Sequence, residues 1–119
     1  MGKHNELGKL GEQKAVDFLL QNNYKVKMRN YRYLKGEIDI IALKGNTLAI
    51  VEVKSRTSDF LENLSDTISP KKIKLLVATA NHFVEQESLD VEVRFDVITV
   101  LKKGNFYELE HLENAFYHF

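Results

Sequence analysis

Four charged residues stand in two adjoining apolar segments and could together do chemistry on a phosphate. Glu37 and Asp39 belong to the first segment, and Glu52 and Lys54 belong to the second. Both segments are rich in Ile, Val and Ala, and a polar turn at 44–47 separates them, which predicts a β-hairpin. Every second side chain of a strand points to the same face, so the four groups can converge on one face of this hairpin.

The expected register of the hairpin decides which charges meet. If the two leucines that flank the turn pair with each other, Asp39 faces Glu52 and Glu37 faces Lys54, while Ile38 belongs to the opposite, apolar face. Directly opposed residues have Cβ atoms about 4.5–5.5 Å apart, so the two carboxylates repel unless a cation or Lys54 lies between them. A slip of one residue would undo this geometry.

Carboxylate oxygens in this arrangement suit Mg²⁺ or Mn²⁺, which take oxygen ligands. Asp39 and Glu52 would hold the ion with water and a backbone carbonyl. Lys54 could orient or deprotonate a water, or stabilise charge on a phosphate. The alternative is ordinary surface electrostatics, including a simple Glu37–Lys54 ion pair. Four charged groups inside two apolar strands nevertheless cost hydrophobic burial, which favours a functional site.

Basic residues gather in two places although the net charge is zero, with 17 Lys and Arg against 17 Asp and Glu. A nucleic-acid binder needs only a local basic face, and solvated surface is the alternative. Tyr31 and Tyr33, within the first cluster, could stack on single-stranded or branched nucleic acid, or could pack in the sheet. The first cluster holds Lys25, Lys27, Arg29, Arg32 and Lys35, and the second holds Lys71, Lys72 and Lys74.

The elements that position these groups follow from periodicity. Helical patterns cover about 6–21 and 70–86, the second with Ser69 as its N-cap before Pro70. Glu12 falls on the apolar face of the first helix, and Gly8 and Gly11 beside it would allow a close backbone approach. The order of helix, three strands, helix and two strands indicates an α/β fold with a mixed central sheet flanked by helices. The expected strands are 24–33, 37–43, 47–54, 92–101 and 105–110, with a loop at 55–67 and a packed aromatic C-terminus at 115–119.

Length and composition bound the remaining possibilities. We expect a single domain spanning 1–119, since 119 residues leave no room for a second core. With no cysteine there is no disulfide or thiolate site, and the four histidines show no metal-ligand spacing. The first residues do not form a signal peptide, and no apolar stretch is long enough to span a membrane. We therefore expect a cytoplasmic protein without a membrane partner.

Asp39, followed 13 positions later by Glu52-Val53-Lys54, resembles the core motif of the PD-(D/E)XK nuclease superfamily. The whole chain is more closely similar to the YraN family of small bacterial proteins, which are related in fold to Holliday-junction resolvases. Ile38 stands where the superfamily has its proline. The segments that carry the resemblance are Gly8-x-x-Gly11-Glu12, Arg29-Asn30-Tyr31-Arg32, Gly36-Glu37-Ile38-Asp39, Val51-Glu52-Val53-Lys54-Ser55-Arg56, Lys72, Arg94-Phe95-Asp96-Val97 and Ala115-Phe116.

The resemblance implies a restriction-endonuclease-like three-layer fold. It also implies metal ligands at Asp39 and Glu52, a catalytic lysine at Lys54, and a supporting helix carboxylate at Glu12. With Glu37 of the hairpin cluster, these residues form the expected site. The nucleic-acid contacts that we expect around it are Arg29, Arg32, Arg56, Lys72 and Arg94.

Two functions remain open from the sequence. The first is an endonuclease, dependent on Mg²⁺ or Mn²⁺, acting on DNA that is branched or otherwise structured. The second is a nucleic-acid-binding or assembly module that keeps the fold with little or no catalysis. The joint presence of Asp39, Glu52 and Lys54 favours the enzyme. Because resolvase-like enzymes cut two strands symmetrically, the resemblance also leaves a homodimer open.

Overall fold

A computed structural model of the chain describes residues 3–57 and 68–116. It contains the predicted two helices and five strands, in the predicted order. The ends of these elements differ from the expected ones by at most a few residues. The elements are α1 (Lys3–Gln21), β1 (Lys25–Tyr33), β2 (Gly36–Lys44), β3 (Thr47–Thr57), α2 (Pro70–Gln86), β4 (Glu92–Lys103) and β5 (Phe106–Leu112).

The strands form one mixed sheet in the order β1-β2-β3-β4-β5. The neighbours β3 and β4 are parallel, and α2 lies between them in the chain. The other neighbouring strands are antiparallel. A parallel pair needs a crossover connection, and the helical pattern that follows β3 in the sequence supplies it. The mixed sheet that the order of elements predicted is therefore confirmed.

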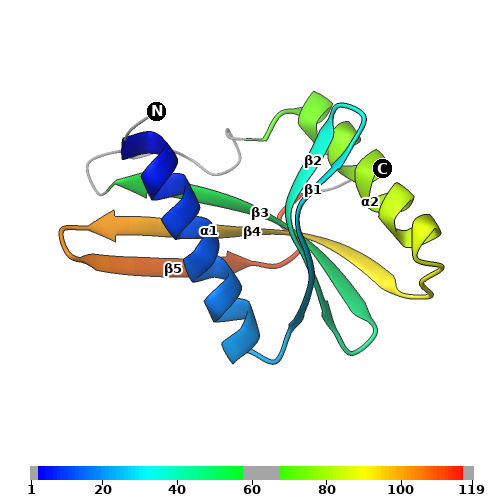
Figure 1. Cartoon of the computed structure of the whole chain (residues 1–119), viewed down its shortest axis with the longest axis horizontal. Helices are drawn as coiled ribbons and strands as arrows, with labels where there is room; N and C mark the ends of the chain where they lie inside the picture. The colour runs from blue at the N-terminus through cyan, green and yellow to red at the C-terminus, as the bar shows by residue number, and fades with distance from the viewer. Residues whose placement is uncertain (1–2, 58–67, 117–119) are drawn as a thin grey trace.

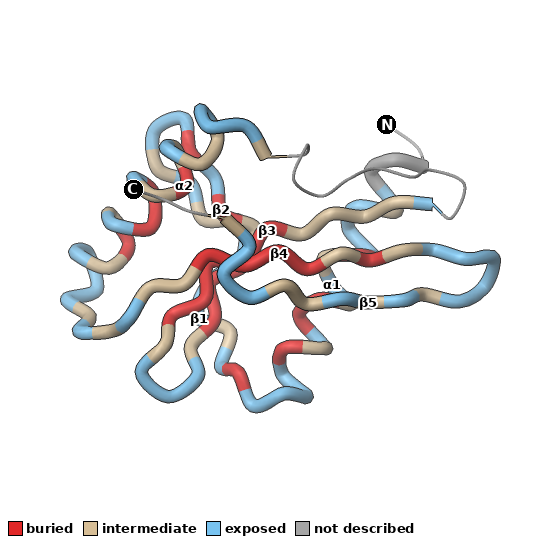
Figure 2. The backbone as a smooth tube through the Cα atoms, turned by 180° about the vertical axis from the view of Figure 1, so that it is seen from behind, coloured by how far each residue is buried: buried red, intermediate tan, exposed pale blue. Residues whose placement is uncertain are grey.

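The two helices cover opposite faces of the sheet, which gives three layers (Figure 1). Ala15, Val16 and Leu19 of α1 pack on one face, with Ile40 and Val51 among their contacts. Leu76, Ala80 and Phe83 of α2 pack on the other. Figure 2 shows that the buried residues of the sheet concentrate where β2, β3 and β4 run together. This arrangement confirms the α/β, restriction-endonuclease-like architecture.

The start of α2 is fixed by its N-cap, as its sequence predicted. The Ser69 side chain accepts a hydrogen bond from the Lys72 backbone nitrogen at 3.1 Å, and Pro70 occupies the first turn. A proline is tolerated there because the first backbone N–H groups of a helix have no partner within it. The cap sets the position of the first turn of α2, which carries Lys72 toward the sheet.

The predicted register of the β2–β3 hairpin is confirmed near its turn, but the pairing stops earlier than expected. The paired residues run from Lys44 with Thr47 to Ile40 with Val51. Beyond this point β2 turns away with β1, while β3 continues beside β4 (Figure 1). Asn30, in the part of β1 next to this bend, has a φ of 53°. Asparagine tolerates this left-handed conformation better than most residues, so it allows the bend.

The bend corrects the predicted face of one residue. Ile38 was expected beside Ile40 on one apolar face, because strands alternate. It packs instead in the core beneath α2, while Ile40 packs in the core beneath α1. Strict alternation holds only for a regular strand, and β2 is not regular between these two residues.

Two further predictions concern the loop after β3 and the C-terminal segment. The loop expected from Ser55 begins later, because β3 continues through Thr57, and residues 58–67 lie outside the described part of the chain. The aromatic C-terminus does pack on the body: the Ala115 backbone nitrogen donates to the Phe95 carbonyl oxygen at 2.9 Å, and the Phe116 and Phe95 rings lie 5.7 Å apart. Residues 117–119 are outside the described part.

Neither described helix has the apolar length that crossing a bilayer requires.

Candidate functional site

Asp39 lies where β2 separates from β3. Its carboxylate bridges the gap, because the Val53 backbone nitrogen donates a hydrogen bond to Asp39 Oδ2 at 2.8 Å. This side-chain bond follows the last backbone pair of the two strands, Ile40 with Val51. Asp39 is thus held at the mouth of the split in the sheet by the strand that carries Glu52.

Asp39 is exposed to two cavities, one on each side of the split. The first measures about 850 Å³ and lies between the N-terminal half of α1 and the outer part of β3. The second measures about 310 Å³ and lies between the β1–β2 hairpin and the start of α2. The charged residues of the first are Lys9, Glu12, Arg29, Asp39, Lys54 and Arg56. Those of the second are Lys35, Glu37, Asp39, Glu52, Lys71 and Lys72.

The carboxyl group of Asp39 holds its proton unusually well. Burial is the largest cause, followed by the negative charge of Glu52, and together with Glu12 they raise the pKa of Asp39 to about 7. The Val53 N–H bond and the charge of Lys72 act in the opposite direction and do not cancel these effects. Buried, closely spaced carboxylates with a raised pKa are typical of functional sites, because negative charge is concentrated there.

Glu52 is buried, with 6% of its side chain exposed. Its Oε2 atom is contacted by two lysines, Lys54 at 3.3 Å from the same strand and Lys72 from the first turn of α2. A buried carboxylate requires such partners, because an isolated charge in the interior is costly. The structure therefore brings Asp39, Glu52, Lys54 and Lys72 together.

Glu12 reaches the same region from α1, and 17% of its side chain is exposed. Its Oε1 atom accepts a hydrogen bond from Asn30 Nδ2 at 3.0 Å and lies 3.4 Å from Arg29 Nη2. The close approach of α1 that makes this possible depends on Gly11. A β-carbon at Gly11 would lie 1.9 Å from Ser55 Oγ. Gly8, by contrast, is exposed, and a β-carbon there would meet nothing within 4 Å, so its expected packing role was wrong.

Glu37 does not pair with Lys54 as the extended register predicted. Glu37 Oε2 instead accepts a 2.8 Å ion-pair hydrogen bond from Arg32 Nε of β1, while Lys54 pairs with Glu52. The reason is the bend: once β2 leaves β3, Glu37 stays with β1, to which it remains paired. Glu37 still borders the second cavity, on its exposed side.

The expected nucleic-acid contacts divide into three groups. Arg29 and Arg56 line the first cavity, and Lys72 lines the second. Arg32 is largely exposed, with 77% of its side chain accessible. Arg94 lies apart from both cavities, so the structure does not bring it to the site.

Arg94 is part of a buried polar cluster under α1. It donates to both oxygens of Asp96, at 2.9 and 2.8 Å, and to the Tyr24 hydroxyl at 2.6 Å. His111 and the Asn114 backbone nitrogen also bond Asp96, which is fully buried. Burial alone would raise the pKa of Asp96, but the hydrogen bonds from His111 and Arg94 outweigh it and lower that pKa.

The two tyrosines of the first basic cluster pack within the protein. Tyr31 donates to or accepts from His82 Nδ1 at 2.7 Å and lies edge-on to Phe83, with ring centroids 5.2 Å apart. The Tyr33 ring stacks directly on the ring of His82, with a centroid distance of 3.7 Å. The sequence left open whether Tyr31 stacks on nucleic acid or packs within the protein, and the structure shows that it packs.

A model of Uncharacterised protein family UPF0102 matches residues 11–100. The chain belongs to this family. It is 48% identical over 119 residues to a UPF0102 protein of Christiangramia forsetii and 47% identical over 119 residues to one of Flavobacterium psychrophilum, covering 100% of both chains in each case. A UPF0102 protein of Bacteroides fragilis is 41% identical over 117 residues, which are 98% of this chain and 97% of that one.

In this UPF0102 member, the carboxylates at the split fit a hard divalent cation in chemical type. Asp39 and Glu52 offer oxygen atoms, and the raised pKa of Asp39 reflects first its burial and then the negative charge of Glu52, which Lys72 only partly offsets. Within residues 3–57 and 68–116, no three or more His, Cys, Asp or Glu side chains are arranged to hold a metal. Mg²⁺ is commonly held through one or two carboxylates and several waters, which is what this pair can offer.

Two residues of the candidate site were not among those expected from the sequence. Lys9 lines the first cavity from α1, one turn before Glu12. Asn30 both bends β1 and bonds Glu12. The signal for Lys9 was its helical spacing of three from Glu12, which puts both on one side of a helix. For Asn30, the signal was an asparagine inside an otherwise strand-like segment, a residue type depleted in strands.

Proposed function

We propose that this protein is a metal-dependent endonuclease that hydrolyses phosphodiester bonds of nucleic acid, DNA in particular, at the split between β2 and β3. The observation that carries the proposal is that the Asp39 and Glu52 carboxylates line the same cavity at this split, with Lys54 against Glu52. Acidic and basic groups that converge on a cavity wall are the parts that phosphoryl chemistry requires.

In this proposal Asp39 and Glu52 hold Mg²⁺ or Mn²⁺. A bound divalent cation would activate a water and offset charge on the scissile phosphate. Lys54, with 16% of its side chain exposed, lines the first cavity and can donate to a phosphate oxygen or to the attacking water. Glu12 and Asn30 hold the neighbouring wall in position through their 3.0 Å hydrogen bond.

The basic residues around both cavities support a polyanionic substrate. Arg29 and Arg56 line the first cavity and Lys71 and Lys72 the second, so a strand that crosses the split meets cations on both sides of Asp39. Phosphate contacts of this kind give affinity that falls with salt, even where the net charge of the protein is zero.

The deciding experiment is cleavage of labelled junction, flap, single-stranded and duplex DNA with Mg²⁺ or Mn²⁺. We expect the wild type to cut at least one of these substrates, and Asp39→Asn and Lys54→Ala to lose the activity while remaining folded. Glu108→Gln is the matched control, because Glu108 is an exposed carboxylate paired with Lys103 at the far end of the sheet. Cleavage that survives in Asp39→Asn, or that proceeds without a divalent cation, would contradict the proposal.

A second candidate is a nucleic-acid-binding or assembly module with the same fold and little or no catalysis. The ion pairs of Glu52 with both Lys54 and Lys72 favour it, because lysines then supply the positive charge that a metal would otherwise provide. Binding with a steep salt dependence, combined with no cutting on any substrate, would select this candidate.

Two further parts of the nuclease proposal are a cytoplasmic location and a homodimer. Cell fractionation tests the location, and light scattering tests the oligomeric state.

A further inference from the structure

The tip of the β1–β2 hairpin carries an exposed leucine in a disfavoured conformation. Leu34 has 86% of its surface exposed and a φ of 55°. Residues other than glycine, asparagine and aspartate rarely adopt this left-handed conformation, and leucine has no polar group to stabilise it locally. The two-residue turn between the paired Tyr33 and Gly36 accounts for the positive φ. An exposed leucine at this position, where glycine or asparagine is usual, leaves an apolar side chain available to a partner.

An apolar groove of about 410 Å³ lies behind this leucine. Tyr33 and Leu34 line it from the hairpin, and Leu75 and Ala78 line it from α2. The hairpin packs tightly on the helix at this point, since a β-carbon on Gly36 would lie 1.9 Å from a side-chain oxygen of α2. The groove is therefore built from two elements that are held firmly together.

The groove adjoins the candidate site. It shares Lys35, Gly36 and Leu75 with the second cavity, whose walls also include Asp39 and Glu52. A polymer with one phosphate at these carboxylates can therefore place a neighbouring unit in the groove without crossing another element.

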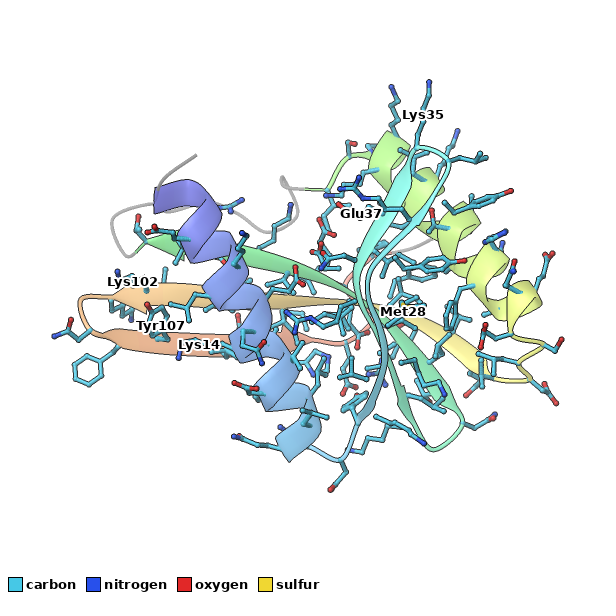
Figure 3. The ribbon with its side chains drawn as sticks, in the orientation of Figure 1. Lys14, Met28, Lys35, Glu37, Lys102 and Tyr107 are labelled. Atoms are coloured by element: carbon cyan, nitrogen blue, oxygen red, sulfur yellow. The ribbon has the colours of Figure 1, made fainter. Side chains whose placement is uncertain are left out.

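The charges at the rim match a nucleotide chain. Lys35 lines the groove at the tip of the hairpin (Figure 3), and Lys71, at the start of α2, lines the second cavity beside it. Neither forms an ion pair with another residue in the described ranges. Lys35 at the groove and Lys71 in the adjoining cavity suit phosphates, and the apolar side chains of the groove suit the flat face of a base. This is the combination that binds single-stranded nucleic acid.

We propose that this groove binds an unpaired nucleobase of the strand that is engaged at Asp39 and Glu52, with Leu34 as the outer wall against the base. The inference rests on the proposed function for the identity of the polymer. A base within a duplex has both faces covered by its neighbours, so it cannot enter the groove. The substrate class is therefore DNA with unpaired bases next to the engaged phosphate, such as a flap, a gap or a branch point.

The test is binding with Ca²⁺ in place of Mg²⁺ or Mn²⁺, because a cation can then still lie between the two carboxylates and the phosphate while binding, not cleavage, is measured. Fluorescence anisotropy compares a duplex that carries a short unpaired flap with a fully paired duplex of the same length. We expect the wild type to prefer the flap DNA by roughly fivefold or more, at the lower end of what one stacked base contributes. A 2-aminopurine base in the flap should change its fluorescence when the protein binds.

Leu34→Gly is the decisive variant, because glycine favours the φ of 55° and leaves the fold intact. It should lose the preference and the 2-aminopurine signal, yet bind paired duplex within about twofold of the wild type. Phe106→Ser is the matched control: Phe106 is 77% exposed at the β4–β5 turn, away from the hairpin tip (Figure 1), and its replacement should keep the preference.

Equal binding of both DNAs by the wild type, or an unchanged preference in Leu34→Gly, would overturn the inference. The inference would also be overturned if Leu34→Gly abolished self-association of the protein but left DNA binding unchanged. The groove would then be occupied by a second copy of the chain. Absence of cleavage by the wild type leaves this binding test readable. Failure of the proposed function and failure of the inference are thus distinguishable.

Discussion

The Val53 backbone nitrogen donates a 2.8 Å hydrogen bond to Asp39 Oδ2 across the split between β2 and β3. This bond draws the Asp39 carboxylate toward the strand that bears Glu52, where burial and like charge both oppose its ionisation. The split creates the cavities, and the hydrogen bond holds the acid at their common wall. The chemistry expected of this protein therefore depends on where a strand pairing ends.

The first prediction concerns pH and Asp39. Its pKa is about 7 in the folded protein, whereas an unfolded aspartate titrates near about 3.9. Between these values the folded state binds a proton that the unfolded chain releases. The contribution of Asp39 to the free energy of unfolding is thus fully present below about pH 4 and is lost as pH rises through about 7, by up to about 4 kcal/mol.

Urea denaturation without divalent cations, from pH 4 to pH 8, measures this effect. Asp39→Asn cannot titrate but keeps an oxygen to accept the Val53 N–H. The free energy of unfolding of the wild type minus that of Asp39→Asn should therefore fall across the range. The same difference for Glu108→Gln, an exposed carboxylate, should change far less. A constant difference for Asp39→Asn would mean that Asp39 ionises normally.

The second prediction concerns competition for Glu52. Lys72 contacts Glu52 Oε2, so a cation that binds this oxygen competes with the lysine. We expect Lys72→Ala to bind Mn²⁺ more tightly, on the order of tenfold or about 1.4 kcal/mol. Titration of free Mn²⁺ by electron paramagnetic resonance measures the affinity. Lys71→Ala removes a neighbouring lysine of the same cavity and should leave the affinity near that of the wild type. Weaker or equal binding in Lys72→Ala would refute the competition.

The sequence was sufficient to predict the elements, the layers and the hairpin register near its turn, because these follow from periodicity and from the flanking leucines. It was not sufficient to predict that pairing stops after Ile40 and Val51. Alternation of apolar residues continues through Ile38, so the pattern gives no sign of the bend. The bend depends on the conformation of Asn30 and on the packing of Ile38 beneath α2. The asparagine in β1 was a local signal for the bend, whereas the packing of Ile38 beneath α2 is a tertiary effect that the alternation in β2 does not encode.

The site was predicted in part for the same reason. Asp39, Glu52 and Lys54 lie close to the last paired residues, so the regular register still places them nearly correctly. Glu37 lies further along β2, where the departure of the strand separates it from Lys54 and leaves it with Arg32. The register of a strand thus constrains its residues less, the further they lie from the last paired position.

The third prediction concerns the contact between α1 and β3. Gly11→Ala would place a β-carbon 1.9 Å from Ser55 Oγ, which must rotate away, and 3.1 Å from Ser55 Cβ, so that α1 and β3 must also separate by a few tenths of an ångström. We expect the free energy of unfolding to fall by about 1–3 kcal/mol, as for other overpacked interiors. Gly8→Ala is the matched control in the same helix. With nothing within 4 Å of its β-carbon, Gly8→Ala should stabilise the protein by up to about 1 kcal/mol. Equal effects of the two substitutions in urea denaturation would contradict the close approach at Gly11.

The last prediction separates a structural arginine from a substrate-binding one. Arg94 was expected to contact phosphate, but it is bonded to the fully buried Asp96. Its spacing of two from Asp96 was the available signal, since both side chains then share a face of β4. Removing one partner of a buried pair leaves an uncompensated charge, so Arg94→Ala should lower the free energy of unfolding by about 3–5 kcal/mol. Because the pKa of Asp96 is lowered in the fold, its contribution to stability is present at neutral pH and is lost as pH falls through that pKa.

Arg56→Ala supplies the contrast, because Arg56 lines the first cavity. On the proposed function it should weaken DNA binding and reduce the slope of log affinity against log salt by about 1. At temperatures where Arg94→Ala remains folded, that variant should bind DNA with the slope of the wild type. Paired urea denaturation and salt titrations of both variants measure these effects. A reduced salt slope in folded Arg94→Ala would mean that Arg94 contacts the nucleic acid after all. An unchanged free energy of unfolding in Arg94→Ala would mean that the buried Asp96 does not require Arg94.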